Sequence, residues 1–360
     1  MRGSKIWAIG LVAVVAMNGA ALAEEAANPL PRKGEVKDEN YPGVTVIYDS
    51  LRDAAGHRLR LILTHPQQAA TRFPVIFVAG WLSCDTVEAP AGTTGAAQLV
   101  FRALAQLPGF ATVRMDKAGV GDSEGDCARS DFSEELGAYQ QAFRRLKDYP
   151  FVDTDRVFIL GLSNGGGFAP LVAEGLPVQG YVVAGGWIKT WYEHMLEIER
   201  RRLTLSGHTP ADLNTLMKSV EQLYSAYLLD RQQPKDIFAK HPDLKSLWEG
   251  DPTQQYGRPV AYYQQLQDLN LMEIWSAVQV PVLALHGEFD WIMSRSDPEI
   301  LVGLVNRNMP GIAQFVELPS TGHTFEHYAS QEAAFAGRPE LPFDEGIAKR
   351  IGAWFQQHRD

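Results

Sequence analysis

The sequence predicts an α/β fold in which a mostly parallel, twisted sheet carries helices on both faces. Apolar runs alternate with amphipathic segments along most of the 360-residue chain, as parallel strands and their crossover helices require. This alternation stops over residues 187–279, which carry helical periodicity and many Trp and Tyr side chains. We therefore expect one core in two parts, 24–186 and 280–360, with a helical cap (187–279) inserted between them.

The individual elements follow from local patterns. Two β-rich runs, 44–51 and 57–64, flank Asp53-Ala54-Ala55-Gly56 and predict a hairpin. The uninterrupted apolar run 73–79 predicts a strand that is buried on both faces. Further strands are expected at 111–115, 155–160, 180–184, 280–285 and 313–318. Helices are expected at 94–107, 132–149, 187–202, 260–269, 298–306 and 343–358, and after Thr209-Pro210.

The strand that ends at Leu160 runs into Gly161-Leu162-Ser163-Asn164-Gly165, a Gly-x-Ser-x-Gly motif, and a segment of small residues follows. A very tight strand-to-helix turn strains the backbone of its corner residue, and flanking glycines keep the neighbouring backbone clear of it. The hydroxyl of Ser163 is then exposed above the sheet, and the backbone N–H of Asn164 can face a substrate carbonyl oxygen. We expect Ser163 to be a nucleophile.

The same motif occurs a second time, as Gly121-Asp122-Ser123-Glu124-Gly125. Several loop residues separate it from its strand, no helical run follows directly, and the carboxylates beside Ser123 would oppose a developing alkoxide. Because the strand–turn–helix context decides the matter, we expect Ser123 to belong to a glycine-rich connection.

A serine nucleophile needs a base that titrates near neutrality, and histidine does so. Of nine histidines, His323 alone lies in a glycine-flanked loop directly after a late core strand. Asp290, at the end of the preceding strand, is the candidate carboxylate that orients the imidazole. His323 could instead be a histidine of a surface loop, and Asp290 could instead cap a helix or form an ion pair. If Asp290 is not the acid that orients His323, Asp297 and Glu288 are the substitutes.

A second donor to the substrate oxygen is expected from the loop after the 73–79 strand. The backbone N–H of Trp81 is the first candidate and that of Leu82 the second. Trp81 can instead, or in addition, line the pocket with its ring.

These residues together resemble the α/β-hydrolase superfamily, over roughly residues 44–358. The elbow 161–165, the acid loop 287–290 and Gly322-His323 follow one another in the family's order. The loop 116–123 also looks like the one that such enzymes carry after their next strand. One departure is Ala79-Gly80-Trp81, where members often have His-Gly. The inserted segment is most similar to the caps of esterases and serine aminopeptidase-like members.

The resemblance implies acyl transfer to water, from a small-molecule ester or peptide, with no metal or organic cofactor. A rival interpretation is zinc, because 323–327 reads His-x-x-Glu-His, but this motif starts in a glycine-preceded loop after a strand, and zinc would leave the Ser and Asp loops unexplained. A second is a catalytically inactive binding module on the same fold, which the presence of all three triad residue types disfavours.

The substrate has to be argued from the cap. Trp187, Trp191, Tyr192 and Met195 could line an apolar acyl pocket, although such a stripe more often holds a cap to its core. Glu193 and Glu197 are candidates for binding a terminal ammonium group in an aminopeptidase, or else for pairing with Arg200 and Arg201 at the surface. Esterase activity is therefore the first hypothesis and peptidase activity the second.

The first 23 residues read as a signal peptide, with Arg2 and Lys5, an apolar core (6–17) and the cleavage motif Ala21-Leu22-Ala23. An uncleaved anchor is the alternative; otherwise the mature chain has no stretch that approaches a membrane span, and we expect a periplasmic or secreted protein. Export permits a disulfide between Cys84 and Cys127, which follow neighbouring strands. The formal charge of −10 argues against a nucleic-acid partner.

Overall fold

The computed structural model describes residues 27–359, apart from 36, 69–71, 174, 175 and 342. The signal peptide predicted at residues 1–23 lies outside this range. Within the described part, no helix is both long enough and apolar enough to cross a membrane.

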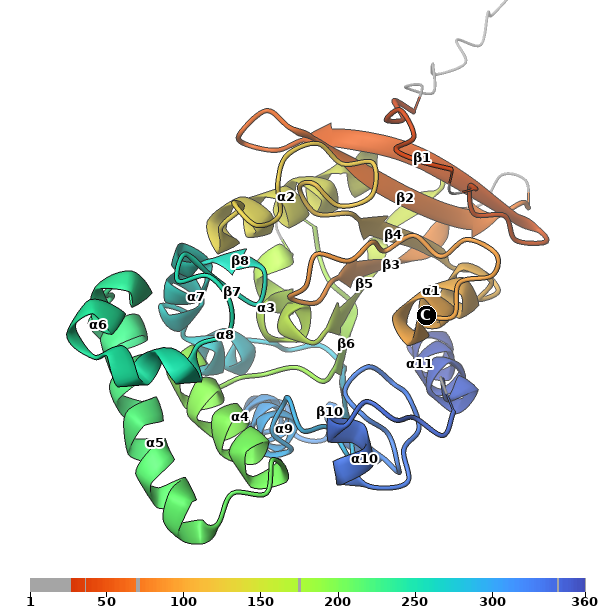
Figure 1. Cartoon of the computed structure of the whole chain (residues 1–360). Coiled ribbons are helices and arrows are strands. Elements are labelled where there is room, and N and C mark those ends of the chain that lie inside the picture. Colours follow the sequence, from red (N-terminus) through yellow and green to blue (C-terminus); the bar gives the residue numbers. More distant parts are fainter. Residues whose placement is uncertain (1–26, 36, 69–71, 174–175, 342, 360) are drawn as a thin grey trace, which may run out of the picture.

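The centre of the molecule is an eight-stranded sheet with the order β1-β2-β4-β3-β5-β6-β9-β10 (Figure 1). β2 runs antiparallel to β1 and β4, and the other neighbouring pairs are parallel. The predicted hairpin and mostly parallel sheet are thus confirmed. The strands are β1 (Val44–Arg52), β2 (Arg58–Pro66), β3 (Phe73–Ala79), β4 (Ala111–Met115), β5 (Val152–Leu162), β6 (Gly180–Ala184), β9 (Val282–Gly287) and β10 (Ala313–Leu318).

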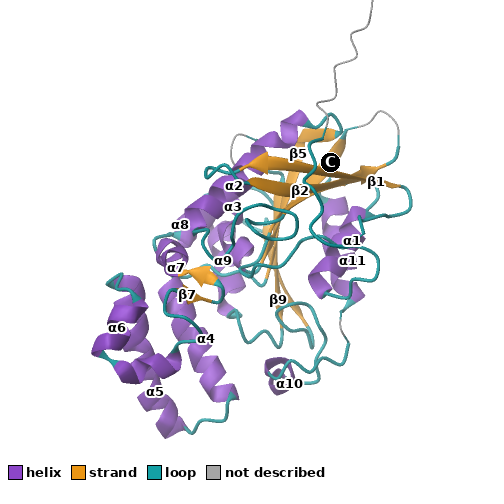
Figure 2. Ribbon diagram, turned by 45° about the horizontal axis from the view of Figure 1, so that its top comes forward, coloured by secondary structure: helices purple, strands orange, loops and turns teal. Residues whose placement is uncertain are grey.

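Two layers of helices cover the sheet (Figure 2). Side chains of β5 alternate between them, since Val157 and Ile159 belong to one apolar cluster and Phe158 and Leu160 to the other. This explains why the central strands read as continuous apolar runs. One layer contains α1 (Ala96–Ala105) and α11 (Glu345–Gln357). The other contains α2 (Phe132–Arg144), its 3₁₀ extension η1 (Arg145–Asp148), α3 (Asn164–Val172), α8 (Leu271–Ser276) and α9 (Ser296–Asn308).

The segment between β6 and β9 is mostly helical, and its larger part, from α4 to α6, stands to one side of the sheet (Figure 1). Its elements are α4 (Trp191–Leu205), α5 (Pro210–Tyr224), the π-helical turn η2 (Ser225–Leu229), α6 (Pro234–Lys240), the 3₁₀ helix η3 (Pro242–Leu247), β7 (Gln254–Gln255), β8 (Arg258–Pro259), α7 (Val260–Gln267) and α8. A short helix α10 (Gln331–Phe335) follows β10.

Three details differ from expectation. The inserted segment is not all helix, because β7 and β8 pair antiparallel around Tyr256-Gly257, both with positive φ. Helix α4 begins at Trp191 rather than Trp187, because Thr190 and Glu193 form a capping box at its start. Helices α7 and α8 lie within the range expected for the cap, yet they pack against α2, α3 and α9 of the core. Trp275 Nε1 of α8 donates to the carbonyl of Gly167 in α3 at 2.8 Å.

The polar segment before β1, which looks like a loose lead-in from its sequence, is tied to the sheet by buried charges. Glu39 pairs with Arg114 of β4 at 2.7 Å, and both side chains are at most 1 % exposed. Burial alone would raise the pKa of Glu39, but the charge and hydrogen bonds of Arg114 outweigh it and lower this pKa. The carboxylate therefore stays ionised inside the protein.

We expect Glu39→Gln to lower the free energy of unfolding by about 3–5 kcal/mol, because the variant leaves the Arg114 charge buried without its counter-charge. Urea unfolding followed by circular dichroism measures this. The matched control is Glu345→Gln, which breaks the solvent-exposed pair with Lys349 and leaves the unfolding midpoint almost unchanged. Equal effects of the two variants would contradict the importance of the buried pair.

Candidate active site

Ser163 lies at the corner between β5 and α3 and has a left-handed backbone conformation (φ 53°, ψ −121°). Glycine is needed on both sides of it. A Cβ on Gly165 would collide with the carbonyl oxygens of Ala79 and Gly80, and one on Gly161 would lie 2.6 Å from the Cα of Gly166. The motif thus packs a strained turn directly against the end of β3, which presents the serine hydroxyl above the sheet.

The structure brings Ser163, His323 and Asp290 into one hydrogen-bonded chain. His323 Nε2 lies 2.9 Å from Ser163 Oγ, and His323 Nδ1 lies 2.7 Å from Asp290 Oδ2. The other carboxylate oxygen of Asp290 accepts the backbone N–H groups of Ile292 and Met293, each at 2.9 Å. The aspartate is thereby fixed on both oxygens, and it holds the imidazole with one nitrogen toward the serine.

The two substitute acids are engaged elsewhere. Asp297 accepts the backbone N–H of Ile188 at 3.0 Å, and Glu288 accepts that of Ser320 at 2.7 Å. Asp290 is therefore the carboxylate that contacts His323.

The pKa values of the pair shift as a base and its anchor require. Burial would lower the pKa of His323, but the adjacent Asp290 charge and hydrogen bond outweigh it and raise this pKa above its ordinary value. Burial likewise would raise the pKa of Asp290, and the His323 charge together with hydrogen bonds lowers it instead. Asp290 is thus ionised wherever His323 titrates.

The loop after β3 is held from behind by two buried side chains. The hydroxyl of Tyr139 accepts the backbone N–H of Gly80 at 3.1 Å. Lys117 Nζ donates to the carbonyl of Trp81 and, at 3.1 Å each, to those of Leu82 and Ser83. Burial lowers the pKa of Lys117 to about 8, and Glu135 at 3.5 Å opposes this shift.

Two backbone donors are left free beside Ser163. Within the described part of the chain, neither the N–H of Trp81 nor that of Asn164 has a hydrogen-bond acceptor. The ring of Trp81 also lines the cavity and stacks on Phe101 at 5.9 Å between centroids. The ring of Trp81 therefore lines the pocket, and its backbone N–H is free to donate to a substrate oxygen.

A disulfide links Cys84 to Cys127, with 6.0 Å between the Cα atoms. It joins the loop after β3 to the loop after β4. Arg258 of β8 contacts Cys127 Sγ and pairs with Glu135, so the cap hairpin lies against the same link.

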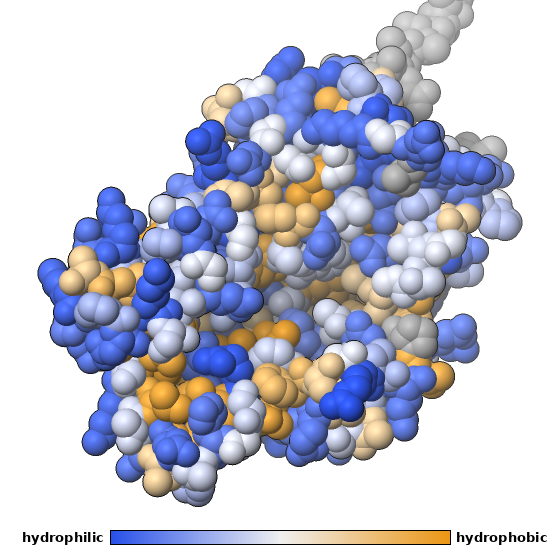
Figure 3. All heavy atoms as spheres, viewed as in Figure 1, coloured by the Kyte–Doolittle hydropathy of each residue, from blue (hydrophilic) through white to orange (hydrophobic). Residues whose placement is uncertain are grey.

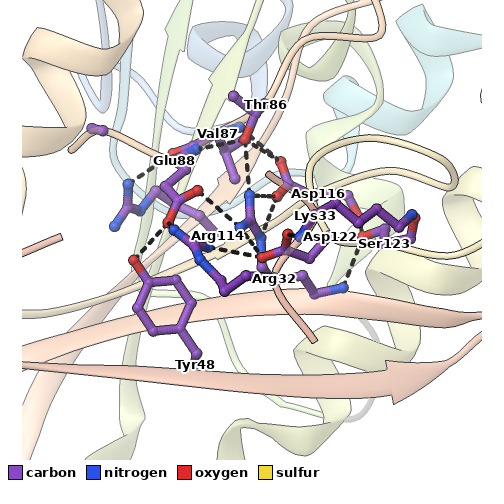
Figure 4. A network of polar contacts seen from close by, with 12 residues as sticks. Arg32, Lys33, Tyr48, Thr86, Val87, Glu88, Arg114, Asp116, Asp122 and Ser123 are labelled. Carbon is purple, nitrogen blue, oxygen red and sulfur yellow. Dashed lines mark hydrogen bonds and ion pairs between the residues drawn. The ribbon is translucent and has the colours of Figure 1, made fainter. Parts of the chain in front are cut away.

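Ser123 has a structural role. Its Oγ accepts the backbone N–H of Arg60 at 2.8 Å and donates to the carbonyl of Asp116 at 3.2 Å. Figure 4 shows the polar network beside it, which includes Asp116, Asp122 and Glu88. These three carboxylates pair with the buried Arg60 guanidinium. A hydroxyl so enclosed cannot approach a substrate.

A cavity of about 1000 Å³ opens over Ser163 and His323, between the core and the cap. Figure 3 shows the hollow at the centre of this face, with apolar side chains gathered along its walls. Trp191 of α4 lines it, as the sequence suggests.

The other cap residues singled out from the sequence do not line the cavity. Trp187 is fully buried and its Nε1 donates to Asn164 Oδ1 at 3.0 Å. Tyr192 binds Gln267 and Ser225, Glu193 caps its own helix, and Glu197 pairs with Lys189. These side chains hold the cap in place, which agrees with the packing and ion-pair interpretation of the sequence and not with the alternative in which they contact substrate.

The structure instead places on the cavity wall several polar residues of the cap that the sequence did not single out, among them His194, Glu199 and Gln255. His194 and Glu199 lie on the same helix as the residues proposed from the sequence. Helical spacing alone does not tell which face of a cap helix turns toward the site.

The zinc interpretation finds no support in the geometry. His323 is used by Asp290 and Ser163, and His327 pairs with Glu340 at 3.3 Å. Among the described residues, no group of three or more His, Cys, Asp or Glu side chains could hold a metal ion.

Comparison with known proteins identifies the family. The model of the X-Pro dipeptidyl-peptidase (S15) family matches residues 55–310. The chain belongs to this family. It is therefore a serine hydrolase of the α/β-hydrolase superfamily, as the resemblance implied. The matched range contains Ser163 and Asp290, and His323 lies beyond its end.

Solved structures are similar in fold. They include Est1E from Butyrivibrio proteoclasticus with ferulic acid bound (15 % identity, TM-score 0.54, covering 87 % of this chain and 98 % of that one). Another is a hypothetical protein from Pseudomonas aeruginosa (16 % identity, TM-score 0.53, covering 91 % of this chain and 99 % of that one). A third is an esterase from Pyrococcus furiosus (14 % identity, TM-score 0.52, covering 93 % of this chain and 99 % of that one). No curated protein matches the sequence significantly.

The raised pKa of His323 predicts the pH dependence of hydrolysis. The base must be neutral to accept the serine proton, so kcat/KM should rise with pH through a midpoint above about 6.5, the ordinary histidine value. In Asp290→Asn the stabilising charge is lost, so the midpoint should move to lower pH and kcat should fall by up to about 10⁴-fold. Steady-state rates from pH 5 to 9 test this, and an unmoved midpoint would argue against the coupling.

Proposed function

We propose that the protein is an exported serine hydrolase that cleaves carboxylic esters through Ser163, His323 and Asp290. The observation that carries the proposal is the continuous hydrogen-bonded chain from Asp290 through His323 to a serine on a strained elbow. In this mechanism Ser163 Oγ attacks the ester carbonyl carbon while His323 takes its proton. The oxyanion that forms is bound by the backbone N–H groups of Trp81 and Asn164.

Collapse of the tetrahedral intermediate breaks the bond to the leaving alcohol, which receives its proton from His323. A water molecule, deprotonated by the same imidazole, then attacks the acyl-enzyme. The acid product leaves and Ser163 recovers its proton. Throughout the cycle Asp290 keeps the imidazole oriented and stabilises its charged form.

The second candidate is a peptidase that acts on peptide bonds after proline, and the family match favours it. The ester hypothesis comes first because Glu193 and Glu197, the carboxylates considered for a terminal ammonium, bind within the cap instead. An inactive binding module fits poorly, because such a module has no need of a serine, histidine and aspartate in hydrogen-bonding order.

Two observations support export. Residues 1–23 have the charged, apolar and small-residue regions of a signal peptide. The Cys84–Cys127 disulfide belongs to oxidising compartments such as the periplasm or the extracellular space.

We expect Ser163→Ala to abolish hydrolysis, because Ser163 Oγ is the hydroxyl that His323 contacts. The control, Ser123→Ala, removes the second motif's serine and should keep most of the activity per folded molecule, at a cost of about 1 kcal/mol in stability. Purified proteins are assayed on p-nitrophenyl esters and on Ala-Pro-p-nitroanilide. Ester turnover alone supports the esterase, anilide turnover alone supports the peptidase, and activity that survives in Ser163→Ala contradicts the site.

Cleavage of the leader should leave Glu24 as the first residue of the mature protein. Expression in a bacterial host, followed by cell fractionation and mass spectrometry of the intact chain, tests this. A full-length chain found only in the cytoplasm would refute export without touching the catalytic proposal.

A further inference from the structure

The cavity extends well beyond Ser163, along one face of α4. Trp191, His194, Ile198, Glu199 and Arg202 of this helix all line it. The rise of 1.5 Å per residue spreads these side chains over about 16 Å of helix. An acetyl or other short acyl group would fill only a small part of this space.

The wall close to the triad is uncharged on the side of α4. His194 is 3 % exposed, and its Nδ1 has no hydrogen-bond partner in the described part of the chain. Burial lowers the pKa of His194 to about 3, so the imidazole is neutral at physiological pH. Together with Trp191 and Ile198 it forms a passage suited to a neutral chain.

We call the part of the lining around Glu199, which lies eight residues and about 12 Å along α4 from Trp191, the far end of the cavity. It is polar and is built by three cap elements. Glu199 of α4 receives two hydrogen bonds from Arg202, at 2.9 and 2.6 Å, both on its Oε2. Gln255 of β7 donates its amide N–H to the hydroxyl of Tyr224 of α5 at 2.9 Å. Trp248 and Tyr256 add ring surfaces to the same lining.

Two oxygen atoms in this end are left without donors. Gln255 is 3 % exposed, and its Oε1 has no partner among the described residues. Glu199 is also 3 % exposed, and none of its hydrogen bonds in the described structure reaches Oε1. A buried acceptor without a donor, such as Gln255 Oε1, costs about 1–3 kcal/mol, so a molecule that brings a donor to this end of the cavity is rewarded.

The charge of this end favours a neutral donor. The Glu199 carboxylate is already paired with the Arg202 guanidinium, and Glu249, the other acid that the cap contributes to the lining, is exposed to solvent. A ligand ammonium would therefore compete with Arg202 rather than meet an unpaired buried charge.

We propose that this far end, defined by Glu199, Tyr224, Gln255 and Tyr256, is a subsite for a neutral hydrogen-bond donor, a hydroxyl or amide group, at the distal end of an elongated ester substrate. The proposal rests on the hydrolase function of Ser163 and adds the substrate class. Short esters would use the triad without this subsite, and long esters that end in a hydroxyl group would use both.

The test compares p-nitrophenyl esters of matched chain length, from four to twelve carbons, that end in methyl, hydroxyl or ammonium. A mirrored set carries the same groups on the alcohol side of acetate esters, with acid release titrated at constant pH. The wild type should prefer the hydroxyl-ended over the methyl-ended ester by about tenfold in kcat/KM at the longer lengths, as one added hydrogen bond allows. At the shortest length the preference should vanish.

Gln255→Leu should abolish this preference while the shortest ester is cleaved as before, which also shows that the variant is folded. The matched control is Gln254→Leu, the preceding residue, whose side chain does not line the cavity. An equal loss for methyl-ended and hydroxyl-ended esters, or the same effect from Gln254→Leu, overturns the subsite. A preference for ammonium over hydroxyl overturns its neutral character.

A binding measurement separates the subsite from the catalytic proposal. Calorimetry with Ser163→Ala compares dodecanoate and 12-hydroxydodecanoate, and likewise dodecanol and 1,12-dodecanediol, none of which needs turnover. Tighter binding of the hydroxylated member of either pair, lost when Gln255→Leu is added, supports the subsite even if no ester is cleaved. Equal binding within both pairs refutes it, whereas ester cleavage that persists in Ser163→Ala refutes the catalytic site alone.

Discussion

The close approach of the β5–α3 turn to the end of β3 is the constraint on which the rest of the site depends. Ser163 can hold a positive φ only because Gly161 and Gly165 have no side chains where its turn meets the start of α3 and the end of β3. The energy stored in such a corner is of the order of 1–3 kcal/mol, and the packed sheet beneath it supplies the compensation. The same contact brings the loop after β3 next to the serine, so the hydroxyl and the two free N–H groups arise from one piece of packing.

Buried charge stabilises the surroundings of that corner. Lys117 and Tyr139 fix the loop that contains Trp81, and the disulfide adds a covalent link three residues further on. Arg60 and Arg114 gather the carboxylates of the lead-in, of the loop after β3 and of the loop after β4. Each arginine is nearly inaccessible to solvent and is paired, which is the condition under which a buried charge can be tolerated.

The sequence was sufficient for the parts governed by local rules. Apolar runs located the strands, and the glycines around Ser163 distinguished it from Ser123, because strand–turn–helix context is visible in one dimension. The order of Asp290 and His323 along the chain placed both at the same edge of a parallel sheet. The cap was harder to predict, because Glu193, Glu197 and Glu199 share one helix and periodicity does not identify the face that turns inward. At the start of this helix, Glu193 forms a capping box with Thr190, so its carboxylate does not line the pocket.

The β7–β8 hairpin was missed for a related reason. Its strands are two residues long, so no alternating pattern could develop, and Tyr256 at its tip has a backbone conformation that tyrosine seldom adopts. Lys117 also escaped notice, because three of its four partners are backbone carbonyls, which leave no trace in a sequence.

The way the loop after β3 is fastened has an evolutionary consequence. Its anchors, Lys117 and Tyr139, lie behind the loop and are not among the residues that line the cavity. The residues that fix the loop with the Trp81 donor are thus different from the cap residues that line the cavity. Substitutions on the cap wall can therefore accumulate while the anchors of the loop that contains Trp81 stay in place. A scaffold divided in this way can drift from one ester or peptide preference to another in single steps, each of which leaves a working catalyst.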